Sequence, residues 1–217
     1  FTWLLTRGET IKVHSQIAYE ARKANFLIPL SNKRVDVPFE GATVLDPDRG
    51  AYHVPVSGLD FASLYPSIMI AHNLCPTTFV KLPKYDNVKG IKYNKYQWEG
   101  GNYKFVDNSS VVGLVPGILA SLWEERKKVK KQMGAEKNPD IKAVLNGKQL
   151  AIKVSMNSIY GAFGSASFSM PCKPIASTVT YTGRKMIEHS KKCAEEFYDG
   201  SAKCGGIKAR VIYGDTD

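Results

Sequence analysis

The sequence has few cysteines and no motif that would pair them. Its four cysteines are scattered over 217 residues without a C-x-x-C pair, and its four histidines show no metal-ligand spacing. We therefore expect neither a zinc site nor a disulfide framework, and this cysteine usage is typical of a reducing compartment. A signal-peptide pattern and an apolar run long enough to span a membrane are also absent from the sequence.

Acidic residues are scarce relative to basic ones. The chain has 30 lysines and arginines against 20 aspartates and glutamates, which is a formal net charge of +10. This excess favours an anionic partner, and nucleic acid is the first candidate, with a basic protein that binds no polyanion as the alternative. The length allows one large domain or two small ones.

Hydrophobic spacing and turn residues predict both helices and strands. Residues 1–27 have roughly helical spacing, and Pro29 is expected to end this segment. Residues 81–110 are polar, aromatic and turn-rich, which indicates an irregular insertion with a hairpin. The other expected elements are extended pieces at 43–45 and 51–54, a buried strand at 59–62, helices at 65–72 and 176–198, a loop or short strands at 161–174, a strand at 207–213 and a final turn at 214–217.

Two strong helices with a short connection predict an antiparallel helical hairpin. The first spans residues 115–133 with Pro116 in its first turn, and the second begins at Asn138-Pro139-Asp140 and runs to about Tyr160. Those three residues combine a cap, a first-turn proline and a first-turn acid. Nine lysines and arginines against four acidic residues lie between residues 115 and 161. Half of the excess positive charge therefore lies in this hairpin.

Carboxylates occur at two places in the sequence where they could bind a catalytic metal ion. Asp60, in the stretch GLDFASLYPS, follows a short apolar run and precedes a helix start with Pro66 in its first turn. Outward-pointing amides at such a start suit phosphate oxygens, and the carboxylate suits a divalent metal. Asp215 and Asp217 lie at the far end of the chain. If the fold brings Asp60 and Asp217 together, the pair can hold two Mg²⁺ ions for phosphoryl transfer. Each Asp alone is also compatible with a turn or cap residue.

The two helices of the hairpin also carry cations and amides, each set on one face, and these faces could lie opposite each other. Arg126 and Lys130 share a face of the first helix. The residues that share one face of the second helix are Gln149, Lys153, Asn157 and Tyr160. Together these faces could grip one polyanion such as a nucleoside triphosphate. Because neither G-x-x-x-x-G-K-[ST] nor G-x-G-x-x-G is present, side chains and metal would hold the phosphates. A solvated basic face is the alternative, and Lys127, Lys128 and Lys131 fit it.

Three segments, in order, resemble the motifs of a known family. DFASLYPSI (60–68), KVSMNSIYG (153–161) and YGDTD (213–217) resemble the polymerase motifs of family B DNA-directed DNA polymerases, and an RKKVK run lies between the first two. The segments FEGATVLDP and IMIAHNLCPTT are similar to the delta-type branch, from eukaryotes or their large DNA viruses. The resemblance covers nearly the whole chain, least clearly residues 81–110. It implies a nucleotidyltransferase that adds deoxynucleotidyl groups from dNTPs to a primer 3′-hydroxyl in DNA replication, in the nucleus or at a viral replication site.

The resemblance implies a role for each site residue. Asp60 and Asp217 would be the carboxylate ligands of two Mg²⁺ ions, with the Phe61 carbonyl as a backbone ligand. Asp215 would be a secondary or structural carboxylate beside them. The nucleotide-binding residues would be Ser63, Leu64, Tyr65, Arg126, Lys130, Lys153 and Asn157. The residues under the nascent base pair would be Tyr160 and Gly161.

The resemblance also implies a fold, an α+β polymerase palm with the helical hairpin inserted as fingers. Residues 1–114 would form an N-terminal connection and the first part of the palm, 115–161 the fingers, and 162–217 the second part of the palm, cut in the last motif. The family has a proofreading exonuclease before this region and the last palm pieces and thumb after it. We therefore expect a fragment that is inactive alone. Its parent would bind primer–template DNA and could reach a sliding clamp or accessory subunits through regions outside this chain.

Two alternatives stay open at this point. One is an RNA-dependent polymerase or reverse transcriptase, which shares palm chemistry but usually has adjacent aspartates in the last motif, whereas Thr216 separates them here. The other is a non-catalytic, polymerase-derived protein that binds nucleic acid. Such a protein typically loses a metal carboxylate, and both Asp60 and Asp217 are present, so divalent-metal binding would distinguish the two.

Overall fold

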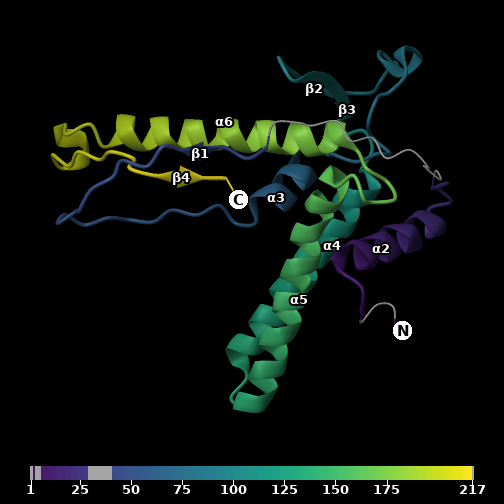
Figure 1. Ribbon diagram of the computed structural model, residues 1–217, viewed down its shortest axis with the longest axis horizontal. Coiled ribbons are helices and arrows are strands. Elements are labelled where there is room, and N and C mark those ends of the chain that lie inside the picture. Colours follow the sequence, from purple (N-terminus) through teal and green to yellow (C-terminus); the bar gives the residue numbers. More distant parts are fainter. Residues whose placement is uncertain (1, 3–5, 29–40, 217) are drawn as a thin grey trace.

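The fold consists of helices that pack on one another, with two small two-stranded antiparallel sheets outside the helical core (Figure 1). The computed structural model describes residues 2, 6–28 and 41–216. Its elements are α2 (Glu9–Lys23), β1 (Val44–Leu45), α3 (Leu64–Ala71), the short 3-10 helix η1 (Pro83–Tyr85), β2 (Tyr93–Trp98), β3 (Gly101–Val106), α4 (Leu114–Ala135), α5 (Pro139–Gly164), α6 (Lys173–Phe197), the 3-10 helix η2 (Ala202–Cys204) and β4 (Gly214–Asp215). The predicted α+β class is confirmed. None of the described helices combines the length and apolar character needed to cross a membrane.

Helices α4 and α5 form the predicted antiparallel hairpin, which extends away from α6 in Figure 1. The Asn138 side chain caps α5 by accepting hydrogen bonds from the backbone N–H groups of Asp140 (2.9 Å) and Ile141 (3.4 Å). Val129 of α4 and Ile152 of α5 are buried within the hairpin. The sequence also predicts an apolar stripe along α4, formed by Ile118, Leu122, Val129 and Met133. Because the cap and this stripe are local, the hairpin was predictable from its own residues.

Helix α5 continues to Gly164, beyond its predicted end near Tyr160. Gly161 therefore lies inside the helix and not in a following loop, so the loop prediction was wrong for residues 161–164. The reason is tertiary, because Ala162 and Phe163 are almost fully buried in the core. Their burial offsets the cost of about 1 kcal/mol that an interior glycine imposes on a helix.

The core lies where the base of the hairpin meets helices α2, α3 and α6. Its fully buried side chains include Met69 of α3, Leu119 of α4, Ile159 of α5 and Val179 of α6. Helix α2 contributes Val13, Ile17 and Ala21, which are spaced by four residues and so share one face. Helical spacing in the N-terminal segment was predicted correctly, although its buried stripe includes Val13 and leaves Ile11 and Ala18 half-buried. The predicted break at Pro29 lies outside the described residues.

The predicted hairpin in residues 81–110 is confirmed as β2 and β3. The strands pair from Tyr93 opposite Val106 to Trp98 opposite Gly101. Phe105 is fully buried, and the Trp98 ring stacks on Tyr181 of α6 with centroids 4.4 Å apart. These contacts anchor the insertion to α6, so it is a folded part of the molecule.

Strand β4 pairs with β1, with Val44 opposite Asp215 and Leu45 opposite Gly214. A Cβ atom at Gly214 would lie 2.9 Å from side-chain carbons of both Leu45 and Ile187, so a larger residue there would displace the ends of these two side chains. The buried hydroxyl of Thr216 donates to the Thr43 carbonyl and accepts from the Thr43 N–H, both at 3.0 Å. These two side-chain hydrogen bonds extend the pairing of β1 with β4 by one residue.

Two strand predictions were wrong in their placement. Leu59 is 90% exposed, and residues 59–62 lead into α3 as an irregular segment. The strand expected at 207–213 has only an isolated bridge from Lys208 to Asp199, while the expected turn at 214–215 is strand β4. In each case the residues favour extended backbone, but a strand also needs a partner ladder, which the local pattern does not specify.

Asn73 joins three parts of the chain from a fully buried position just after α3. Its Nδ2 donates to the carbonyls of Val106 (2.8 Å) and Val111 (2.7 Å), and its Oδ1 accepts from the Gly113 N–H at 2.8 Å. Its backbone has φ 54°, a left-handed conformation that asparagine tolerates better than most residues. The side chain thus fixes the end of β3 and the start of α4 relative to α3.

We expect Asn73→Ala to destabilise the fold by about 3 kcal/mol, because it leaves buried backbone groups unsatisfied and places alanine in a left-handed conformation. Urea denaturation of the 217-residue chain followed by circular dichroism measures the change. Asn102→Ala, at an exposed position on β3, is the matched control and should change stability by less than about 0.5 kcal/mol. Equal effects of the two substitutions would contradict the bridging role.

Candidate active site

Asp60 lies in the irregular segment that precedes α3. It is exposed, and it makes no hydrogen bond or ion pair with any residue in the described part of the chain. The next side chain, Phe61, packs against the core. Packing of the Phe61 side chain therefore holds the backbone at this point, while the adjacent Asp60 carboxylate stays open to solvent. Carboxylate and carbonyl oxygens here are hard donors of the kind that Mg²⁺ prefers.

Helix α3 begins with an unusual cap. Its N-cap Ser63 has φ 50° and ψ 62°, and the side chain makes no capping hydrogen bond. Pro66 has no N–H, while the Ser67 N–H donates to the Ser63 carbonyl at 3.0 Å and the Ser67 hydroxyl to the Ala62 carbonyl at 2.8 Å. The Ser63 hydroxyl is therefore not used to cap helix α3. The first-turn amides and the helix dipole favour an anion at this position.

The rings of Tyr65 and Tyr160 connect α3 to α5, with centroids 4.4 Å apart and planes inclined by 39°. Burial raises the pKa of Tyr160 to about 12, and the nearby Tyr65 phenol adds to the shift. The phenol of Tyr160 is therefore neutral over the physiological range. A Cβ atom at Gly183 of α6 would lie 3.6 Å from the Tyr65 ring, so α6 also lies against this ring. Sequence reasoning did not identify Gly183, since nothing local indicates its neighbour.

Two contacts set how the hairpin helices face each other. The Arg126 Nε donates to Gln149 Oε1 at 3.3 Å, and Glu125 pairs with Lys148 at 3.0 Å. Arg126 is therefore level with Gln149, and the predicted juxtaposition of the Arg126 face with the Gln149 face is present. Glu124 pairs with Lys127 at 2.8 Å, so that lysine has an acidic partner on its own helix.

The predicted phosphate-binding residues of the hairpin are spread along its axis and do not form a single cluster. We call this row of residues the hairpin ladder. From the Arg126–Gln149 level, Lys153 lies four residues toward the base and Lys130 four residues toward the tip, which is roughly 6 Å each way. Asn157 lies one further turn toward the base. Lys130, Lys153 and Asn157 are exposed and have no polar partner within the described residues. The ladder leads to the Tyr65–Tyr160 contact, and Gly161 beside it has open space where a Cβ would be.

Asp215 on β4 has both carboxylate oxygens occupied. One accepts a hydrogen bond from the Tyr213 hydroxyl at 3.0 Å, and the other accepts from the Thr216 N–H at 2.7 Å. These bonds agree with a structural role for Asp215. Asp217 lies outside the described residues, and the described residues contain no group of three or more acidic, histidine or cysteine side chains arranged to hold a metal. The pairing of Asp60 with Asp217 therefore stays a prediction.

The α4–α5 hairpin carries exposed cations and packs against α3, which begins beside the exposed carboxylate of Asp60. Helices α2 and α6 complete the core around the base of the hairpin, with the short strands outside it (Figure 1). The sequence profile of DNA polymerase family B matches residues 1–217, and the chain belongs to this family.

Curated relatives support the delta-type assignment. The chain is 45% identical over 223 residues to the DNA polymerase delta catalytic subunit of Plasmodium falciparum and 45% identical over 222 residues to that of Candida albicans, in each case over 100% of this chain. It is 42% identical over 219 residues to the DNA polymerase of Paramecium bursaria Chlorella virus NY2A, over 97% of this chain. The matched segments are 20%, 21% and 23% of these relatives. The chain thus spans about a fifth of their length.

A solved structure has the same fold. The family B DNA polymerase of the hyperthermophilic archaeon Pyrobaculum calidifontis superposes with a TM-score of 0.71 at 28% identity, over 99% of this chain and 26% of that one. The likeness includes the region 81–110, which the sequence motifs did not reach.

Proposed function

We propose that this chain is the palm-and-fingers part of a template-directed DNA polymerase of delta type. The enzyme would transfer deoxynucleotidyl groups from dNTPs to the 3′-hydroxyl of a DNA primer during DNA replication. Family membership, the named relatives and the shared fold support this function. The single observation that carries it is the Tyr65–Tyr160 contact, because it joins the first and second motifs in space.

The proposed roles follow the chain from the hairpin to the carboxylates. The triphosphate would lie along the hairpin ladder, held by Arg126, Lys130, Lys153 and Asn157. Its other end would meet the start of α3 at Ser63, Leu64 and Tyr65. The base pair being formed would lie against Tyr160 and Gly161. Each group lies on, or next to, a helix that also contributes buried residues to the core, and these helices would hold the site in place for an anion.

Asp60, the Phe61 carbonyl and Asp217 would hold two Mg²⁺ ions, with Asp215 as a supporting carboxylate. Bound there, the metal ions would lower the pKa of the primer hydroxyl and stabilise charge on the reacting phosphate. Asp60 fits this role because it is exposed, lacks a polar partner within the described residues and lies next to Phe61, which is partly buried against the core.

The larger protein context belongs to the same proposal. We assign residues 1–114 to an N-terminal connection and the first part of the palm, residues 115–161 to the fingers and residues 162–217 to the second part of the palm. The partners would be primer–template DNA and dNTPs, with a sliding clamp or accessory subunits reached through regions that this chain does not contain. The relatives are eukaryotic and viral, which favours the nucleus or a viral replication site.

A direct test uses a chimera in which this chain replaces the matching segment of the Candida albicans delta catalytic subunit. The chimera should extend a primer on a DNA template with dNTPs, and the unaltered relative is the positive control. A chimera that binds primer–template normally yet adds no nucleotide, and whose segment fails to bind Mn²⁺ in titration calorimetry, would favour the non-catalytic alternative. Family B membership disfavours the reverse-transcriptase alternative.

We expect Tyr65→Ala in this chimera to raise ribonucleotide use relative to deoxynucleotide use by roughly tenfold or more. The ring would lie under the sugar, where a 2′-hydroxyl collides with it. Single-nucleotide kinetics with a dNTP and its rNTP give the ratio of kcat/KM values. This ratio is unaffected by any loss of folded protein, which matters because Tyr65 also packs against Tyr160. An unchanged ratio would make Tyr65 a packing residue only.

We expect the 217-residue chain alone to show no templated extension. It spans about a fifth of its relatives, and the remaining four fifths would include surfaces that hold the duplex. The hairpin should still give weak, salt-sensitive DNA binding, because its helices are locally capped and carry much of the positive charge. Primer extension and binding at two salt concentrations measure both properties. Robust extension by the chain alone would contradict this expectation.

A further inference from the structure

The insertion at residues 81–110 carries an unpaired positive surface that the proposed polymerase roles do not use. It contains six lysines against three acidic residues. Lys104 is paired with Asp86, but Lys84, Lys89 and Lys95 are exposed and make no ion pair within the described residues. A polyanion is therefore the partner that matches this surface by charge.

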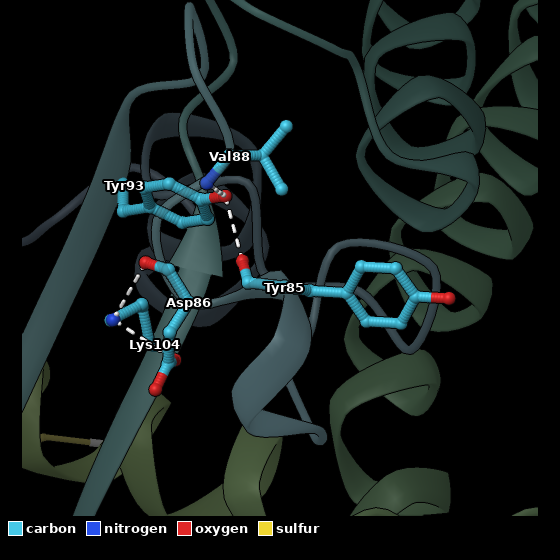
Figure 2. A network of polar contacts seen from close by, with 5 residues as sticks. All are labelled: Tyr85, Asp86, Val88, Tyr93 and Lys104. Atoms are coloured by element: carbon cyan, nitrogen blue, oxygen red, sulfur yellow. Dashed lines mark hydrogen bonds and ion pairs between the residues drawn. The ribbon is translucent and has the colours of Figure 1, made fainter.

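The loop at residues 83–90 is held in place by side chains from the hairpin strands (Figure 2). The Tyr93 hydroxyl donates to the Tyr85 carbonyl at 2.7 Å and accepts from the Val88 N–H at 3.1 Å. Lys104 Nζ donates to the carbonyl and to a carboxylate oxygen of Asp86, both at 3.0 Å. Side chains from β2 and β3 thus form hydrogen bonds with the loop backbone at three residues, Tyr85, Asp86 and Val88.

This network fixes the backbone of Tyr85 and leaves its ring outside. Figure 2 shows the Tyr85 ring pointing away from the other four residues. Tyr85 is 50% exposed, and Lys84 Nζ lies 4.8 Å from the ring centroid. An exposed ring on a fixed backbone loses little conformational freedom when it binds. A flat aromatic face with an adjacent cation suits a nucleobase with its phosphate.

We propose that residues 83–90, with Tyr85 as the stacking residue and Lys84 and Lys89 as phosphate contacts, bind single-stranded nucleic acid. The 3-10 helix η1 and the tip of the α4–α5 hairpin are at opposite ends of the view in Figure 1. The surface is therefore separate from the hairpin ladder, and it needs neither metal nor dNTP. Single strands are favoured over duplex because a base is free to stack only when it is unpaired.

The test is photo-cross-linking of the 217-residue chain to a thymidine 20-mer that carries 5-iodouracil, in EDTA, followed by mass spectrometry. We expect an adduct on Tyr85. Tyr19 is the matched control, because it is 61% exposed and lies 4.3 Å from Lys23 Nζ. An adduct on Tyr19 as abundant as that on Tyr85, or no adduct on Tyr85, would overturn the proposal. Because EDTA prevents metal-dependent catalysis, failure here is distinct from failure of the polymerase function.

Fluorescence anisotropy with the same 20-mer gives an independent measure. Tyr85→Ala should weaken binding by about fivefold or more through loss of one stacked base, and Tyr19→Ala by less than twofold. Lys84→Gln with Lys89→Gln should lower the slope of log affinity against log salt by about 1.4. Equal losses for the two tyrosine variants, or polyglutamate that competes equally against wild type and Tyr85→Ala, would indicate a general basic surface or an acidic protein partner and overturn the proposal.

Tyr93→Phe separates loop rigidity from the ring itself. It removes the hydroxyl that holds Tyr85 and Val88 but leaves the ring of Tyr85 intact. We expect a two- to fivefold loss of affinity for the 20-mer with an unchanged salt slope. Affinity equal to wild type would show that the network does not prepare the loop for binding.

Discussion

Replacing Asp60 by asparagine in the chimeric polymerase should reduce nucleotide addition by more than about a thousandfold, equivalent to about 4 kcal/mol in the barrier. The reason is that asparagine keeps the shape of the side chain but removes the charge that would hold the metal ions. Asp217→Asn should have an effect of the same size. Primer extension under single-turnover conditions measures the rate.

Primer–template affinity should be nearly unchanged in both variants, because duplex binding depends on basic residues elsewhere. Asp140→Asn is the matched control. This acid lies in the first turn of α5, at the tip of the hairpin, and its substitution should leave the extension rate within about twofold. Near-normal extension by either the Asp60 or the Asp217 variant would remove that residue from the metal site.

The double substitution of Arg126 and Lys153 by alanine should raise the dNTP concentration needed for extension and lower kcat/KM for dNTPs by roughly a thousandfold. Each residue would make a charge-assisted contact to phosphate that is worth about 1.5–3 kcal/mol once the nucleotide covers it. The two side chains lie about one helical turn apart on facing helices, so both can contact one triphosphate.

Neighbouring lysines provide the controls for this experiment. Lys127 and Lys148 lie on the same two helices but are paired with Glu124 and Glu125. Their alanine variants should change dNTP use by less than about threefold, since exposed ion pairs contribute little. If the double variant behaves like these controls, the basic face of the hairpin is merely solvated.

The parts of this protein that the sequence determined are those whose cause is local. The hairpin was predictable because Asn138, Pro139 and Asp140 cap and start α5 and because an apolar stripe repeats along α4. The β2–β3 hairpin and the start of α3 were predictable from turn residues and Pro66 for the same reason. The motif residues could be chosen as candidates because their charge and spacing suit phosphate and metal.

Only the tertiary structure decided which of these residues meet. The contact of Tyr65 with Tyr160, the close fit of Gly214 against Ile187 and the continuation of α5 past Gly161 all depend on residues far apart in the chain. Strand positions failed for the same reason, because β1 and β4 are 169 residues apart at the pair Leu45 and Gly214. Extended propensity is a property of a segment, but a strand exists only where a partner backbone completes its hydrogen bonds.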